Sequence, residues 1–280
     1  MTELGLGGWA GASASPVGPM VKRWLRRTDR ARARLALLAA TAPRISDPMV
    51  LFLTAVIALS ALFLAFPVID LAVTDLFFRA GDGFAASQVP VLKAFRKTSD
   101  IVLGLLMLGL LGRLASALAH HGSDAFTVAR RCCYLLVALA LGPGLVVNGI
   151  LKSQWGRPRP IAIDAFGGDA PYQPVWRISD WCQNNCSFVS GEASSAVWFV
   201  AALVLVPARY RLAVGIPVVA YAVLLSANRI AFGGHFLSDV VLSWTISGLV
   251  FAALYRLMVS APGVAQRARA LGRRSVPTPA

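Results

Sequence analysis

The stretch MVLFLTAVIALSALFLAFPVIDL, residues 49–71, is apolar over a length that lets a helix cross a bilayer. Five further apolar blocks follow, and the six together cover about residues 49–71, 101–119, 132–151, 193–206, 212–227 and 237–258. The fourth and fifth blocks are short, so their ends are set only loosely. The pattern predicts an all-α fold: a polytopic membrane protein built as a six-transmembrane-helix bundle.

The composition fits a membrane protein. Of the 280 residues, 57% are hydrophobic and 14% are charged, and the apolar residues come in blocks rather than in the interrupted pattern of a soluble core. The first block is not typical of a cleaved signal peptide, because a polar, Arg-rich segment precedes it and its apolar run is too long. We therefore expect a basic N-terminal segment over 1–48, a six-span domain over 49–258 and a basic tail over 259–280, with disordered chain ends.

The net charge of +14 gathers beside the apolar blocks. Basic residues beside a span mark its cytoplasmic side and can contact anionic lipid headgroups. Those before the first block are Lys22, Arg23, Arg26, Arg27, Arg30, Arg32, Arg34 and Arg44. No interleaving of basic and aromatic residues accompanies this charge, so the pattern argues against nucleic acid as a partner.

The same charge rule orients the whole chain. With a cytoplasmic N-terminal segment, six crossings place every Arg-biased loop on the cytoplasmic side, namely Arg130, Arg131, Arg209, Arg211, Arg267, Arg269, Arg273 and Arg274. The loops at about 72–100, 152–192 and 228–236 then face outward. We expect a multi-pass protein of a bacterial inner membrane, with both termini cytoplasmic and its outward loops in the periplasm.

The four cysteines divide between the two sides of the membrane. Cys182 and Cys186 lie in an outward loop, where an oxidising periplasm permits a disulfide. Cys132 and Cys133 lie at the inner end of the third block and should stay reduced. Because a four-residue separation constrains the geometry of a bridge, the sequence leaves open whether Cys182 and Cys186 are joined.

Three polar clusters lie at the outward ends of the later blocks, where polar side chains are costly without a function. The first, KSQWGRPRP at 152–160, has Lys152 and Arg159 on either side of a turn with Gly and Pro, so both cations can converge on one anion. A point charge together with a planar donor fork suits phosphate. Snorkelling of basic side chains at a helix end explains this cluster as well when it is considered alone.

The second cluster, SFVSGE at 187–192, places Ser190 and Gly191 directly before the fourth block. A hydroxyl and free backbone N–H groups meet there at a helix N-terminus, whose dipole favours anions. A plain helix cap is at least as good an explanation of Ser190.

The third cluster, NRIAFGGHFLSD at 228–239, has His235 and Asp239 four residues apart at the start of a helix, so they share one face. Asp239 can hold one imidazole nitrogen protonated and leave the other free to attack. Arg229 adds a third cation. Such a pair alone is more often structural than catalytic, but three polar clusters on one membrane face favour a catalytic role.

Together the clusters resemble the three signature motifs of the type 2 phosphatidic acid phosphatase family, Lys-x6-Arg-Pro, Pro-Ser-Gly-His and Ser-Arg-x5-His-x3-Asp. Residues 152–160 match the first motif, and Arg229, His235 and Asp239 match the third at the right spacing. The resemblance covers about residues 50–258. It implies an integral-membrane lipid phosphate phosphatase of the acid phosphatase/vanadium haloperoxidase superfamily, with no cofactor and no metal.

The resemblance also implies roles for the residues. His235 would be the nucleophile that forms a phosphohistidine, and Asp239 would orient it. The groups that would bind the phosphoryl oxygens are Lys152, Arg159, Arg229, Ser190 and the backbone of Gly191. This set suits phosphoryl transfer, which chiefly needs positioned positive charge and an in-line nucleophile.

The sequence departs from the family pattern at three positions. Val189 replaces the Pro, Asn228 replaces the Ser, and Glu192 stands where the family has the His that protonates the leaving group. The other two histidines, His120 and His121, fall on the cytoplasmic side. Either Glu192 is the general acid, or the substrate has a good leaving group, as in a diphosphate or a sugar 1-phosphate, and needs none.

Several functions remain open at this point. Candidate substrates are lipid A phosphates, undecaprenyl diphosphate, phosphatidylglycerol phosphate and phosphatidic acid. A lipid phosphotransferase and a non-catalytic relative are the alternatives; vanadate-dependent haloperoxidases share the residue set but are soluble. The expected partners are a phospholipid or lipid-linked phosphate and the bilayer, and the sequence does not fix the oligomeric state.

Overall fold

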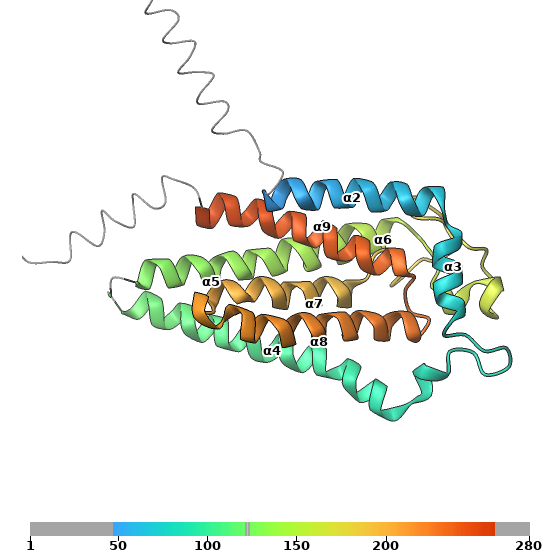
Figure 1. Cartoon of the computed structure of the whole chain (residues 1–280), viewed down its shortest axis with the longest axis horizontal. Helices are drawn as coiled ribbons and strands as arrows, with labels where there is room; N and C mark the ends of the chain where they lie inside the picture. The colour runs from blue at the N-terminus through green and yellow to red at the C-terminus, as the bar shows by residue number, and fades with distance from the viewer. Residues whose placement is uncertain (1–46, 121, 123, 261–280) are drawn as a thin grey trace, which may run out of the picture. The chain divides into compact units, whose positions relative to one another are not determined.

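The computed structural model describes residues 47–120, 122 and 124–260 (Figure 1). Most of the expected basic N-terminal segment, most of the expected tail and His121 lie outside these residues. No β-strand occurs among the described residues. The helical segments of the bundle are α2 (Pro48–Ala65), α3 (Val68–Asp75), α4 (Pro90–Ala119), α5 (Ala125–Leu139), η2 (Ala140–Leu151), α6 (Lys152–Gln154), α7 (Gly191–Ala201), η5 (Ala202–Leu205), η6 (Ala208–Tyr210), α8 (Arg211–Ala231), α9 (Leu237–Tyr255) and η7 (Arg256–Ser260).

Five helical stretches are long and apolar enough to cross a membrane: Pro48–Ala65, Pro90–Ala119, Ala125–Gln154, Ala208–Ala231 and Leu237–Ser260. They confirm an all-α, multi-pass membrane protein and coincide with five of the six apolar blocks. The fourth block forms a shorter apolar helix, Gly191–Leu205. At about 1.5 Å of rise per residue, this helix is shorter than a hydrocarbon core of roughly 30 Å, so helix length supports five crossings and leaves the sixth unsettled.

The first apolar block is not a single helix, which corrects the span expected over 49–71. Helix α2 ends at Ala65, and α3 begins only at Val68, after Pro67. Proline has no backbone N–H and clashes with the preceding turn, so the chain changes direction there. Figure 1 shows α3 turned across the end of α2, at the end of the bundle where α9 begins. The turn brings Asp70 of α3 to that end.

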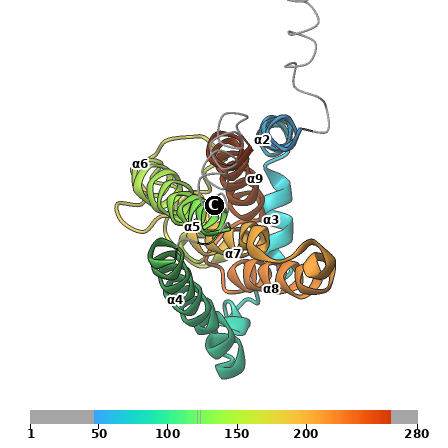
Figure 2. The same cartoon turned by 90° about the vertical axis from the view of Figure 1, so that its left-hand side faces the viewer.

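Helices α5, α7 and α9 form the interior of the bundle, with α2 and α4 outside them (Figure 2). Only 6% of the apolar window of α2, and 6% of that of α4, is buried, against 50% for α9. Trp198 of α7 is fully buried, and its indole N–H donates to the carbonyl oxygen of Leu135, 2.9 Å away. The apolar side chains that α2 and α4 leave uncovered are those expected to face lipid tails.

The third crossing changes its winding part of the way along. After α5 the chain runs as a wider π-helix, η2, with Pro143 inside it. The Asn148 side chain donates to the Pro143 carbonyl oxygen, 2.7 Å away and one turn earlier in the same segment. The π-helical segment ends at Leu151, directly before Lys152, the first residue of the first polar cluster.

Candidate active site

The three polar clusters meet at the end of the bundle where α9 begins. His235 lies in the short turn between α8 and α9 and is 1% exposed. Burial lowers the pKa of His235 well below its usual value, and the positive charges of Arg229, Lys152 and Arg159 lower it further. The imidazole is therefore neutral at physiological pH. The three predicted cations lie close enough for their charges to act on it.

The hydrogen bond that orients His235 comes from an unexpected partner. Its Nδ1 lies 2.8 Å from the Ser187 carbonyl oxygen, which only accepts, so Nδ1 carries the proton and Nε2 is left unprotonated. Asp239 Oδ2 is 4.0 Å from Nδ1, beyond hydrogen-bonding distance. The expected direct bond from Asp239 to His235 is thus replaced by one to the backbone of the second cluster.

Asp239 is fully buried and is occupied by other donors. Its Oδ2 accepts from the Ser187 hydroxyl at 2.5 Å and from the Phe236 backbone N–H at 3.0 Å. Its Oδ1 accepts from Nη1 of Arg157 at 2.5 Å. Through Ser187, the carboxylate fixes the residue whose carbonyl holds His235, so its hold on the imidazole is indirect.

Two members of this network, Arg157 and Asp70, were not among the predicted site residues. Both side chains are closed to solvent, and Nη2 of Arg157 is 2.8 Å from Oδ2 of Asp70. Asp70 also accepts from the backbone N–H of Ser238 at 2.8 Å, at the start of α9. A signal for them existed: Asp70 is an acid inside an apolar block, and Arg157 lies within the first cluster.

The side chain of Tyr172 belongs to the same network. Its hydroxyl lies 3.2 Å from Asp70 Oδ2, and the guanidinium of Arg157 stacks 4.4 Å from the ring centre of Phe236. Burial raises the pKa of Tyr172, and the neighbouring Asp70 carboxylate raises it further. Tyr172 therefore stays protonated and contributes packing and a hydrogen bond.

The cations of the first and third clusters remain open to an anion. Arg229 is 3% exposed, and its buried Nε has no hydrogen-bond partner among the described residues. Arg159 donates its Nε–H to the Asn185 carbonyl oxygen, 3.0 Å away. Neither Lys152 nor Arg159 forms an ion pair with a carboxylate in the described part of the chain. The ammonium group of Lys152 and the guanidinium of Arg159, which have no carboxylate partner there, are suited to bind phosphate oxygens.

Ser190 and Gly191 begin α7 as a helix N-terminus. The Ser190 hydroxyl oxygen accepts from the Ala193 backbone N–H at 3.3 Å, so Ser190 is the N-cap. The first backbone N–H groups of a helix have no intrahelical partner and favour an anion. Gly191 is tightly placed, because a Cβ there would lie 2.6 Å from Oδ1 of Asn148. Cap and anion site are thus compatible at this position.

Glu192, in the first turn of α7, is held by two arginines. Nη2 of Arg96, on α4, lies 2.6 Å from Oε1, and the Arg96 Nε donates to both carboxylate oxygens at 3.1 Å. Nε of Arg229 lies 3.3 Å from Oε2. Two guanidinium groups thus bind the Glu192 carboxylate from opposite helices, α4 and α8.

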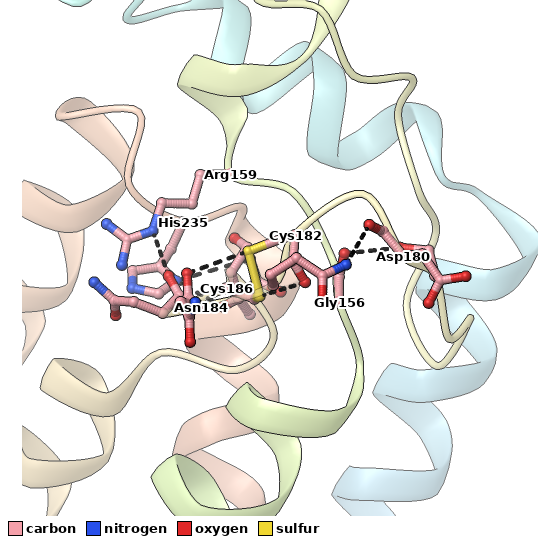
Figure 3. Close-up of a disulfide and its surroundings, with 12 residues drawn as sticks. Gly156, Arg159, Asp180, Cys182, Asn184, Cys186 and His235 are labelled. Carbon is pink, nitrogen blue, oxygen red and sulfur yellow. Dashed lines mark hydrogen bonds and ion pairs between the residues drawn. A yellow bond between two sulfur atoms is a disulfide. The ribbon is translucent and has the colours of Figure 1, made fainter.

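The outward loop is cross-linked beside the cluster. A disulfide joins Cys182 and Cys186, with their Cα atoms 5.6 Å apart, and Cys132 and Cys133 are free. Figure 3 shows Arg159 and His235 beside each other, next to the short segment that the disulfide closes. That segment includes Asn185, the partner of Arg159. Within residues 47–120, 122 and 124–260, no group of three His, Cys, Asp or Glu side chains is placed to hold a metal ion.

The chain is similar to several known proteins. Residues 131–261 match the family model described as PAP2 superfamily. A Lipid A 4'-phosphatase of Rhizobium leguminosarum is 40% identical over 218 residues, which cover 72% of this chain and 93% of the relative. A Lipid A 4'-phosphatase of Francisella tularensis subsp. novicida is 34% identical over 209 residues, 69% of this chain and 90% of the relative.

Two more distant similarities were found. A Lipid A 1-phosphatase of Rhizobium johnstonii is 29% identical over 196 residues, 66% of this chain and 73% of the relative. The crystal structure of a transmembrane PAP2 type phosphatidylglycerolphosphate phosphatase from Bacillus subtilis aligns with a TM-score of 0.49 and 20% identity, covering 77% of this chain and 97% of that one.

Proposed function

The chain belongs to the PAP2 superfamily and is a membrane lipid phosphatase, and we propose that it removes a phosphate from lipid A. The observation that supports this substrate is the sequence identity of the chain to its relatives. Three relatives named Lipid A 4'-phosphatase are 34% to 40% identical to it, whereas the one named Lipid A 1-phosphatase is 29% identical. The 4'-phosphate is therefore the favoured position.

His235 is the proposed nucleophile. Its Nδ1–H is engaged by the Ser187 carbonyl, so the lone pair on Nε2 is available. Nε2 attacks phosphorus, the bond from phosphorus to the lipid oxygen breaks, and a phosphohistidine forms. Water then attacks phosphorus and releases inorganic phosphate, which returns Nε2 to its starting state. Asp239 and Ser187 keep the ring oriented through both steps.

The phosphate would be bound by the side chains of Lys152, Arg159 and Arg229 and by the first turn of α7 at Ser190 and Gly191. The state of Arg229 supports this: its buried Nε makes no hydrogen bond among the described residues and has only a 3.3 Å ion pair with Glu192, which a phosphate oxygen can replace. Fixed cations and backbone N–H groups stabilise the charge that spreads over the equatorial oxygens in the transition state.

Departure of the lipid oxygen needs a proton, because a 4'-hydroxyl is an ordinary alcohol. Glu192 is the proposed general acid, and its ion pairs set a condition on that role. A bound phosphate that takes over Arg229 releases the Glu192 carboxyl from one of its two ion pairs. The alternative is that the substrate has a better leaving group and needs no acid, as in a sugar 1-phosphate or an isoprenyl diphosphate such as undecaprenyl diphosphate.

The proposed location is a bacterial inner membrane, with six crossings, both termini cytoplasmic and the site on the periplasmic face. The Arg-biased loops support this orientation, since the turn with Arg209 and Arg211 lies at the opposite end of α8 from Arg229. The Cys182–Cys186 disulfide at the site end also fits an oxidising compartment.

Phosphate release by the purified protein in detergent, with chelator present, tests this function. Lipid A is the main substrate, with mass spectrometry to tell loss of the 4'-phosphate from loss of the 1-phosphate. Undecaprenyl diphosphate, phosphatidylglycerol phosphate and phosphatidic acid serve for comparison. We expect the 4'-phosphate to be released, His235→Ala to be inactive, and His120→Ala, at the far end of α4, to behave as wild type.

Other outcomes would redirect the proposal. Strong turnover of another lipid replaces the substrate but keeps the mechanism. A modified acceptor lipid that accumulates without inorganic phosphate indicates a phosphotransferase. Activity retained by His235→Ala contradicts the mechanism.

A further inference from the structure

Arg96 approaches the site from a helix that the signature motifs do not include. It lies on α4 (Pro90–Ala119), outside the segment 131–261 that matches the family model. This helix begins eleven residues before the apolar block expected at 101, and the added turns carry the arginine to the site end. Its guanidinium presents Nε and Nη2 together to the Glu192 carboxylate.

The Glu192 carboxylate marks a position where an oxyanion fits between two guanidinium groups. Its Oε1 is 2.6 Å from Nη2 of Arg96, and its Oε2 is 3.3 Å from Nε of Arg229. An oxygen in the place of this carboxylate would therefore contact both arginines. Arg229 is already a proposed phosphate ligand, so an anion that reaches it is within reach of Arg96.

The charge of Arg96 is also felt by the rest of the cation cluster. Burial lowers the pKa of Arg159, and the next largest cause is the charge of Arg96. The two groups therefore repel each other across the same space. A phosphate dianion between them relieves that repulsion more fully than a single carboxylate does.

We propose that Arg96 is a fourth phosphate-binding residue, which exchanges the Glu192 carboxylate for a phosphoryl oxygen of the substrate. The exchange is feasible because the Arg96–Glu192 pair is partly open to solvent, with side-chain exposures of 44% and 28%, and exposed ion pairs contribute little to stability. The planar donor fork of arginine suits the tetrahedral oxyanion. When Arg96 turns to the phosphate, its ion pair with Glu192 breaks, so the Glu192 carboxylate is released as the phosphate binds.

This inference rests on the proposed function, but its test does not need turnover. Orthovanadate, a phosphate analogue, is titrated into the purified protein in detergent and its Kd is measured by calorimetry. Arg96→Ala is expected to raise the vanadate Kd about ten- to hundredfold, as loss of a charge-assisted hydrogen bond does. Arg96→Lys should restore part of the affinity. The control is Lys97→Ala, the exposed neighbour on α4, which should stay within about twofold of wild type.

A second background separates binding from support of Glu192. If Arg96 only held Glu192 in place, adding Arg96→Ala to Glu192→Ala would change nothing. A phosphate-binding Arg96 predicts a further rise of about tenfold or more in the vanadate Kd in that background. A vanadate Kd that Arg96→Ala leaves within about twofold in the Glu192→Ala background would overturn the inference, whatever its effect in the wild-type background. Failure of the proposed function shows up separately, as lipid phosphatase activity that survives His235→Ala.

Discussion

Arg157 and Asp70 form an ion pair that is wholly closed to solvent, with 2.8 Å between Nη2 and Oδ2. The two residues are 87 positions apart in the chain. Asp70 binds the start of α9 through Ser238, while Arg157 binds Asp239. The pair therefore joins α3, the first polar cluster and the start of α9.

The first prediction concerns that pair. Asp70→Asn leaves the Arg157 charge only partly compensated in a buried site, and removing one partner of a buried ion pair costs about 3–5 kcal/mol. We expect a large fall in the thermal unfolding temperature in detergent. The matched control is Asp75→Asn, at the exposed end of the same helix α3, which should unfold as wild type does. Equal unfolding temperatures for the two variants would show that the pair does not stabilise the fold.

The second prediction concerns the protonation of His235. Burial, followed by the charge of Arg229, lowers its pKa, so the folded protein keeps the ring neutral below pH 6.5, where an unfolded chain binds a proton. The contribution of His235 to the free energy of unfolding is therefore fully present above about pH 6.5. It declines as the pH falls toward the lowered pKa.

Nuclear magnetic resonance of ¹³C-labelled histidine can measure this titration. The chain has three histidines, and the His235 signal is assigned by its absence from His235→Ala. We expect a midpoint well below pH 6.5. A midpoint at or above that pH contradicts the burial and charge argument.

The third prediction concerns the disulfide and Arg159. Under non-reducing denaturing conditions, alkylation should label Cys132 and Cys133 only, and reduction should expose Cys182 and Cys186 as well. Since Arg159 is held by the carbonyl of Asn185, inside the bridged segment, the double variant Cys182→Ser/Cys186→Ser should raise KM roughly twofold to tenfold.

The control for this prediction is Cys132→Ser/Cys133→Ser, in α5, toward the end of the third crossing that is away from Lys152 and the site. It should leave KM unchanged. A KM that is the same in both double variants would mean that the bridge does not position Arg159.

The fourth prediction concerns Glu192. As general acid it should contribute about 10²- to 10⁴-fold to turnover of a lipid whose leaving group is an alcohol. Glu192→Gln should therefore lower kcat strongly for lipid A and much less for p-nitrophenyl phosphate, whose leaving group departs without a proton. Near-native turnover of lipid A by this variant across the pH range would exclude the acid role.

Local properties of the chain were enough to predict the membrane class and most of the crossings. Hydropathy is summed along a short stretch, so a span such as 237–258 can be recognised from its own residues, without knowing which helices pack against it. The three polar clusters were found for the same reason: charged and polar residues at the ends of apolar blocks are conspicuous. The spacing of His235 and Asp239 likewise placed both on one helix face.

The ends of helices were harder to predict where a single residue changes the course of the backbone. Pro67 ended the first helix inside an apolar block, and α4 extended eleven residues before its apolar part because its first turns are polar but helical. Because the end of the first helix before Pro67 was not predicted, Asp70 was assigned to the first span. Because α4 was expected to begin at about residue 101, Arg96 was assigned to a loop. Hydropathy does not register either change, since it measures the transfer of side chains and not the direction of the backbone.

The sequence by itself determined that this protein is a helical membrane phosphatase with a histidine and a cluster of cations on one face. Only the tertiary structure decided which groups touch: Ser187 rather than Asp239 on His235, Arg157 with Asp70, and Arg96 with Glu192 across 96 positions of sequence. The reason is physical. Hydropathy and helical periodicity act between near neighbours, whereas a buried ion or hydrogen bond takes whichever partner the packing of distant helices brings within about 3 Å.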